Sequence, residues 1–166
     1  MRYLGRILIG GLICLAPIAG EMFRNYTGKS YTHNQAIQVV SEKLPEKRSR
    51  QLRGVPIVED AKIGAYFDYT DCSRPSIHVV KPDPDVIAHE FGHYIFDCDI
   101  TAAEREEFRN LLKSIQYLRQ PVWHDRYYDA SEGFSNTLTR QMFSPGSMTE
   151  REQPINRRVK AIIERD

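Results

Sequence analysis

The chain has 166 residues and carries 23 lysines and arginines against 22 aspartates and glutamates, which gives a formal net charge of +1. This length is enough for one domain with its own hydrophobic core. The balance of charge argues against nucleic acid as the main partner, because nucleic-acid-binding domains carry a clear excess of basic residues. We therefore expect one globular domain that acts as a monomer.

The first twenty residues differ in composition from the rest of the chain. Two arginines precede an apolar run over residues 7–20, which ends in small residues and is too short to span a bilayer comfortably. This order is typical of a secretory signal peptide. We expect residues 1–20 to be a signal peptide and residues 21–166 to be a secreted or periplasmic domain. Because Ile18 stands where signal cleavage prefers a small residue, the alternative is that the same segment is a membrane anchor.

The first part of the domain predicts one helix followed by three short strands. Asn34 can cap a helix that runs to about Leu44, and Pro45 stops it. The basic segment Lys47–Arg53 is interpreted as a solvated face that could also touch an anionic surface. Short apolar or alternating segments predict strands at Pro56–Ala61, Ile63–Tyr69 and Ser76–Val80.

Helices dominate the second part of the domain. Asp83 is a good N-cap, and Pro84 suits the first turn of the helix that follows it. Thr101 and Glu104 have the capping-box spacing at the start of another helix. Apolar stripes and breaker residues predict that this helix and two more cover residues 101–120, 129–143 and 154–165. The predicted fold class is α+β, with a small mixed sheet packed on several helices.

The most informative segment of the chain is His89-Glu90-Phe91-Gly92-His93, an H-E-x-x-H pattern. On a helix, His89 and His93 lie one turn apart on the same face, so that both imidazoles can reach one Zn²⁺ ion. Glu90 lies beside them outside the ligand positions, where it can act as the general base toward a water molecule. A catalytic zinc site needs a third protein ligand, which this motif does not contain.

Three residues are candidates for the third ligand. Glu132 lies near the start of a predicted helix that can fold back against the first, although it could instead form a capping box with Asp129. His124 is the second candidate. Asp99 is the third, at the spacing that metzincins use, but Phe96 stands where that pattern has a glycine for a sharp turn.

Two motifs together resemble the gluzincin zinc metallopeptidases. The H-E-F-G-H segment is followed by Ser131-Glu132-Gly133-Phe134-Ser135, which is similar to the S/A-E-x-F-A pattern of a later helix in that family. The resemblance is strongest to the anthrax lethal factor-like group, which includes the secreted Pro-Pro endopeptidases. It covers roughly residues 60–163 and implies a zincin-like fold.

The resemblance also implies roles for individual residues. The implied zinc ligands are His89, His93 and Glu132. Glu90 is the implied general base of peptide-bond hydrolysis. The family usually has an acid one turn after the ligand glutamate, to orient a ligand histidine, and Asn136 stands there in this chain. Ligand histidines need such partners, and the candidates nearby are Asn136, Asp97, Asp125 and Asp129.

The expected donor to the oxyanion is less directly indicated. The family has a tyrosine about two turns before the ligand glutamate, and this chain has Asp125 at that place. Tyr128 is our expected catalytic donor, with Tyr127 and His124 as alternatives.

Two cysteines, Cys72 and Cys98, remain after the predicted signal peptide. An even pair in an exported chain predicts a disulfide, which would tie the segment before the third strand to the end of the metal helix. A thiol ligand or two free cysteines are the alternatives.

The function expected from the sequence is that of a secreted zinc-dependent endopeptidase acting on a protein or peptide. We expect the Ser76–Val80 strand to border the cleft and to pair through a free edge with an extended substrate. The alternatives are a zinc-stabilised binding module without turnover, a hydrolase of a non-protein amide and a structural domain without metal.

Overall fold

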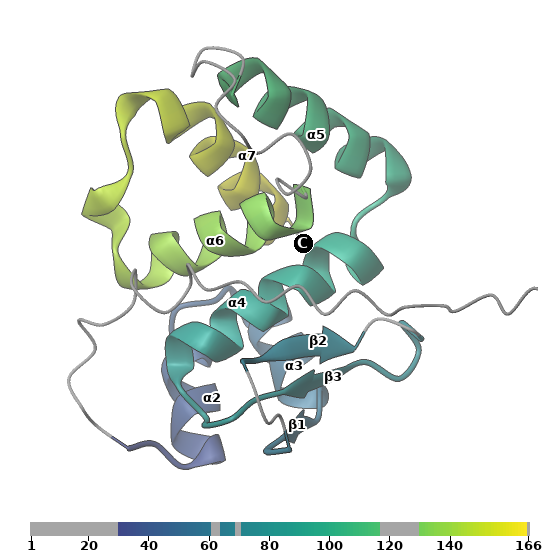
Figure 1. Ribbon diagram of the computed structural model, residues 1–166, viewed down its shortest axis with the longest axis vertical. Helices are drawn as coiled ribbons and strands as arrows, with labels where there is room; N and C mark the ends of the chain where they lie inside the picture. The colour runs from purple at the N-terminus through teal and green to yellow at the C-terminus, as the bar shows by residue number, and fades with distance from the viewer. Residues whose placement is uncertain (1–29, 61–63, 69–70, 117–129, 166) are drawn as a thin grey trace, which may run out of the picture.

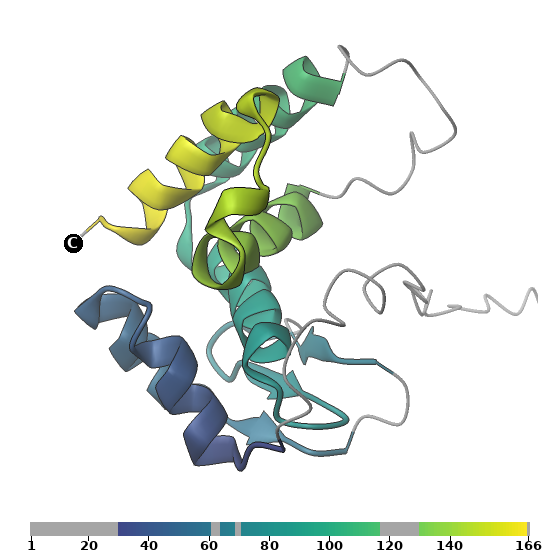
Figure 2. The same ribbon diagram turned by 90° about the vertical axis from the view of Figure 1, so that its left-hand side faces the viewer.

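The computed structural model describes residues 30–60, 64–68, 71–116 and 130–165. Helix α4 (Pro84–Tyr94) crosses the middle of the molecule, with the sheet and the N-terminal helices on one side and the C-terminal helices on the other (Figures 1 and 2). This arrangement confirms the predicted α+β class. The predicted signal peptide or anchor lies outside the described residues. Within the described part of the chain, we find no helix of sufficient length and apolar character to cross a bilayer.

The sheet has three strands in the order β1-β3-β2, and these are Ile57–Val58, Ser76–His78 and Tyr66–Asp68. β1 runs parallel to β3, and β2 runs antiparallel to it. Each strand lies within a predicted segment but is shorter than that segment. The prediction of a free edge on the Ser76–Val80 strand is wrong, because β3 is inserted between the other two. Ile77 donates its N–H to the Pro56 carbonyl at 2.9 Å, which fixes β3 beside β1.

Helices α2 (His33–Ser41) and α3 (Glu46–Gly54) form a pair beside α4. The prediction that Asn34 caps the first helix is wrong by two residues. Thr32 is the N-cap, because its hydroxyl accepts from the Gln35 N–H while the Gln35 side chain accepts from the Thr32 N–H.

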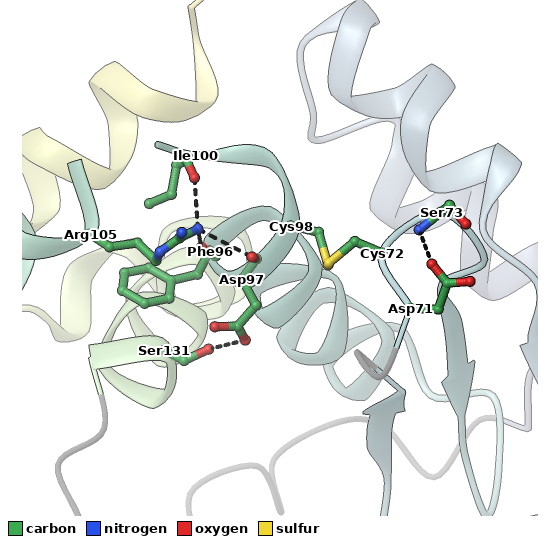
Figure 3. Close-up of a disulfide and its surroundings, with 9 residues drawn as sticks. All are labelled: Asp71, Cys72, Ser73, Phe96, Asp97, Cys98, Ile100, Arg105 and Ser131. Carbon is green, nitrogen blue, oxygen red and sulfur yellow. Dashed lines mark hydrogen bonds between the residues drawn. A yellow bond between two sulfur atoms is a disulfide. The ribbon is translucent and has the colours of Figure 1, made fainter. Parts of the chain in front are cut away.

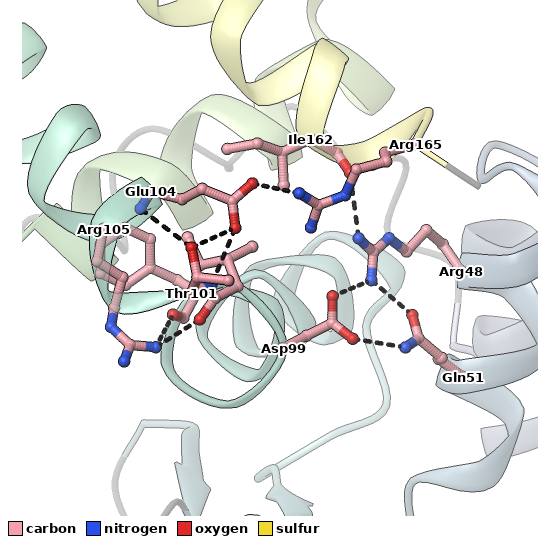
Figure 4. Close-up of polar contacts among 10 residues, drawn as sticks. Arg48, Gln51, Asp99, Thr101, Glu104, Arg105, Ile162 and Arg165 are labelled. Carbon is pink, nitrogen blue, oxygen red and sulfur yellow. Dashed lines mark hydrogen bonds and ion pairs between the residues drawn. The ribbon is translucent and has the colours of Figure 1, made fainter.

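The basic segment Lys47–Arg53 is part of α3, and its interpretation as a solvated face is wrong for Arg48. The Arg48 side chain is fully buried and donates to the Asp99 carboxylate at 2.6 Å and to the Ile162 carbonyl at 3.1 Å (Figure 4). Gln51 also donates to Asp99, at 2.9 Å. A guanidinium can be buried here because distant segments of the chain supply its acceptors.

The metal-motif helix α4 begins as predicted, with Asp83 as N-cap and Pro84 in the first turn. After Tyr94 the helix widens into the π-helix η1 (Ile95–Asp99), in which the Ile100 N–H donates to the Ile95 carbonyl at 3.0 Å. Helix α5 (Ala102–Gln116) follows at once. The capping box predicted from Thr101 and Glu104 is confirmed by the reciprocal bonds between these residues.

The last two helices are α6 (Ala130–Phe143) and α7 (Gln153–Ile163), close to the predicted positions. A core between η1, α5 and α6 contains the rings of Phe96, Phe108 and Phe134, whose centroids lie 5.6–5.7 Å apart. These rings fix the direction in which α6 returns across α4.

The predicted disulfide between Cys72 and Cys98 is confirmed, with the two Cα atoms 5.4 Å apart (Figure 3). It joins the segment before β3 to η1. The C-terminal end of the metal-motif helix is thereby attached to the sheet by a covalent bond.

Candidate metal centre

The centre is built where α4 and α6 cross at very short distance. A Cβ atom added to Gly92 would lie 2.6 Å from the Cα and 2.8 Å from the Oγ of Ser135. Glycine at this position of the H-E-F-G-H motif therefore allows the two backbones to touch. Since Glu132 precedes Ser135 by one turn of α6, the crossing brings its carboxylate against the histidine face of α4.

The structure brings together one atom from each of His89, His93 and Glu132. The two histidine Nε2 atoms are 3.2 Å apart, and each lies 3.4 Å from a carboxylate oxygen of Glu132. A tetrahedral ion with ligand bonds of about 2.0–2.1 Å separates its ligand atoms by about 3.3–3.4 Å. The three side chains thus form a group that can hold a metal ion.

His93 is held on its other ring nitrogen by a serine and an aspartate. Its Nδ1 lies 2.7 Å from the Ser131 Oγ, which in turn donates to the Asp97 carboxylate at 2.7 Å (the Ser131–Asp97 bond is drawn in Figure 3). Of the candidate partners named from the sequence, Asp97 therefore reaches a ligand histidine, through Ser131. Asp125 and Asp129 lie outside the described residues. Sequence reasoning gave no role to Ser131, although the residue stands beside Glu132 in the second motif.

Glu90 faces the centre from a buried position, with 6% of its surface exposed. Its carboxylate accepts a hydrogen bond from the backbone N–H of Phe67 in β2. Burial raises the pKa of Glu90, while the charges of His89 and His93 act in the opposite direction. The result is a carboxyl group with a greater affinity for a proton than an exposed glutamate has.

The electrostatics of the ligand group favour a cation. Hydrogen bonds from His89 and His93 hold the pKa of Glu132 well below its usual range, so the carboxylate is ionised at neutral pH. Burial opposes a charge on His93, but the hydrogen bond to Glu132 and the neighbouring carboxylates outweigh burial and raise its pKa. A metal ion at the centre would replace the proton that these groups otherwise share.

The structure separates Asp99 from the ligand group. Its carboxylate accepts from Arg48 and Gln51, at the junction of η1 with α3. It is therefore engaged elsewhere, and the alternative of Asp99 as third ligand is wrong. The spacing from His93 fails here because η1 continues the helix as a π-turn, without the sharp reversal that a metzincin glycine provides.

The remaining candidates from the sequence cannot be placed, and one further histidine of the sheet lies away from the ligand group. His124, Tyr127 and Tyr128 lie outside the described residues, so their roles as alternative ligand or oxyanion donor stay predictions. His78 is a histidine of strand β3. Its Nδ1 lies 2.6 Å from Asp60 and its Nε2 lies 3.0 Å from the Ser76 hydroxyl, away from the ligand group.

Comparison of the chain with protein-family models, with curated proteins and with solved structures gives no match. The inference of function therefore rests on the residues and geometry of the centre.

Proposed function

We propose that the protein is a zinc-dependent endopeptidase of the gluzincin type with a zincin-like fold. The observation that carries the proposal is the tetrahedral spacing of the ligand atoms of His89, His93 and Glu132, with the buried carboxyl of Glu90 beside them. A purely structural metal site has no use for such a carboxyl group. The donor set of two imidazoles and one carboxylate fits zinc in its catalytic form, which leaves a fourth position open.

Glu90 performs the proton transfer in this proposal. A zinc ion held by the three ligands would supply an activated water molecule and polarise the scissile carbonyl group. Glu90 accepts the proton of the attacking water and later delivers it to the leaving amine. Burial supports this role, because it raises the pKa of Glu90 toward the range in which a carboxyl group both accepts and returns a proton. Tyr128 is proposed as the donor to the oxyanion.

The edge of β2 supports a peptide as substrate. Phe67 is paired with Ile77, which directs its own N–H to Pro56 on the far side of β3. By the alternation of an antiparallel pair, the backbone N–H and carbonyl of Phe67 face the outer edge of β2. Because that N–H donates to Glu90, a peptide extended along this edge would pass directly beside the general base.

The disulfide supports action outside the cytosol. Disulfides persist in oxidising compartments, and the Cys72–Cys98 bond attaches η1, which follows the metal-motif helix, to the segment before β3. We therefore propose that a signal peptide at residues 1–20 directs the protein to secretion or to the periplasm, where this bond would persist.

The proposal is tested by metal content and peptide cleavage of the purified protein and two variants. We expect one zinc ion per chain in the wild type and in Glu90→Gln, because Glu90 is not a ligand. Glu132→Ala should lose metal during dialysis. The wild type should cleave a mixed peptide library, and Glu132→Ala without metal should not. Glu90→Gln should cleave it about 100-fold or more slowly, the scale of a general base. A wild-type protein that binds zinc but leaves every peptide intact would contradict the peptidase and leave the metal site standing.

A further inference from the structure

We infer that Ser131 and Asp97 are positioning residues that set the protonation pattern of His93 and thereby hold its Nε2 ready for the metal. This inference rests on the proposed function, since it concerns the same metal centre. It assigns a task to two residues that the H-E-x-x-H motif does not contain. We call Asp97, Ser131 and His93 together the relay.

The direction of each hydrogen bond in the relay follows from which atoms can donate. An ionised carboxylate only accepts, so the Ser131 hydroxyl gives its single proton to Asp97 across 2.7 Å. The oxygen of Ser131 can then only accept from His93, and the Nδ1 of His93 must carry the proton across 2.7 Å. In a neutral imidazole this leaves Nε2 with its lone pair, and Nε2 is the atom that faces His89 and Glu132.

Asp97 is fixed by contacts that do not involve the centre. The next residue, Cys98, is bonded to Cys72, and the Asp97 carbonyl accepts from the Arg105 guanidinium at 3.2 Å (Figure 3). Arg105 also donates to the carbonyls of Phe96 and Ile100, which the π-turn leaves near the end of the helix. The backbone at Asp97 is therefore held in place independently of the metal centre.

Ser131 connects Asp97 to two of the proposed ligands, His93 through a hydrogen bond and Glu132 as its neighbour in the chain. It is buried, with 4% of its surface exposed, and it directly precedes Glu132 in the first turn of α6. One turn of helix thus supplies a metal ligand and the group that orients another. Asn136 stands where the gluzincins that the sequence resembles have an acid to orient a ligand histidine. In this chain the relay would orient His93 instead.

The test measures metal affinity with Zn²⁺ and Co²⁺ alone, in competition with a chelator, for Ser131→Ala and Asp97→Asn. Loss of such partners typically weakens metal binding about 10–100-fold, and we expect this range for Ser131→Ala. Asp97→Asn keeps the size of the side chain, but its amide N–H₂ can donate to Ser131 and so reverse the relay. We expect a similar loss for it.

Ser135→Ala is the matched control. Ser135 lies one turn further along α6, and its hydroxyl is also buried but has no hydrogen-bond partner within the described parts of the chain. Its removal should leave metal affinity unchanged. Thermal unfolding of each metal-free protein checks that the variants fold, and should Ser131→Ala not fold, Asp97→Asn decides the matter.

A second measurement reads the imidazole directly. Nitrogen-15 NMR of the metal-loaded wild type should show His93 with a protonated Nδ1 that exchanges slowly, and this signal should be lost or shifted in Asp97→Asn. Wild-type affinity in Ser131→Ala or Asp97→Asn would overturn the relay and leave the proposed function intact. Absence of metal binding by the wild type would overturn both.

Discussion

The π-helix η1 carries two aspartates, Asp97 and Asp99, that face two different regions of the molecule. Asp97 points to α6 and holds the relay to His93. Asp99 points to α3 and accepts from the buried Arg48. The first region, the candidate metal centre, contains the three side chains that could hold a metal ion. The second, the Arg48–Asp99 network, consists of a buried cation and the groups that accept its hydrogen bonds.

The two aspartates thus connect one short helix to a group that could hold a metal ion and to a buried ion pair. In the metal centre, three potential ligands approach one another to 3.2–3.4 Å, which is costly without a shared ion or proton. In the Arg48–Asp99 network, the two terminal nitrogens of the buried guanidinium donate to the Asp99 carboxylate and to the Ile162 carbonyl of α7. We therefore expect substitutions in the two regions to separate metal binding from stability.

Arg48→Met should have the largest effect on stability. Methionine fills a similar volume but removes the guanidinium that donates to Asp99 and to the Ile162 carbonyl, so that Asp99 keeps only Gln51 as a donor. Breaking such a buried pair costs about 3–5 kcal/mol in free energy of unfolding. Metal affinity of the remaining folded protein should not change. Urea unfolding measures the first quantity and chelator competition the second. Arg50→Met, on the exposed side of the same helix, is the control and should change the free energy of unfolding by less than about 0.5 kcal/mol.

The same contrast explains which parts could be predicted from the sequence. The metal centre depends on His89, Glu90 and His93, which a single helix places correctly because their spacing is local. The capping box of Thr101 and the start of α4 at Asp83 are local in the same sense. Such signals require only a few neighbouring residues.

The Arg48–Asp99 network could not be predicted, because its partners come from α3, η1 and α7. Arg48 stands among other basic residues in the sequence and differs from them only in what folds over it. The central position of β3 has a similar origin. A strand pattern indicates which side chains lie on each face of a strand. The order of the strands in the sheet depends on the path of the chain between them.

Gly92→Ala should have an intermediate effect on stability and a large one on the metal centre. The added methyl would lie 2.6 Å from the Ser135 Cα. Because this is a backbone atom, the α6 backbone itself would have to shift. Overpacking of this kind costs about 1–3 kcal/mol in free energy of unfolding. The displacement should also carry Glu132 away from the histidines and weaken metal binding.

Gly54→Ala is the control for this substitution, since a Cβ at Gly54 meets no atom within 4 Å. It should leave metal affinity unchanged and alter stability by no more than a few tenths of a kcal/mol. A Gly92→Ala protein that holds metal as tightly as Gly54→Ala would show that the short crossing of α4 and α6 is not what places Glu132.

The smallest expected effect is the pH dependence of stability that comes from Asp99. It belongs to the Arg48–Asp99 network and not to the metal centre. Burial opposes a charge on Asp99, but the hydrogen bond and charge of Arg48 and the hydrogen bond from Gln51 outweigh it and lower the pKa of Asp99. A carboxyl group whose pKa is lower in the folded state stabilises the protein above its unfolded pKa of 3.8, and this contribution is lost as the pH falls below that value. In metal-free protein kept with a chelator, Asp99→Asn should remove this dependence, which we expect to be about 1 kcal/mol, the net scale of one hydrogen bond. Equal losses of stability in wild type and Asp99→Asn between about pH 5 and pH 2.5 would mean that Asp99 contributes as a polar group and not through its charge.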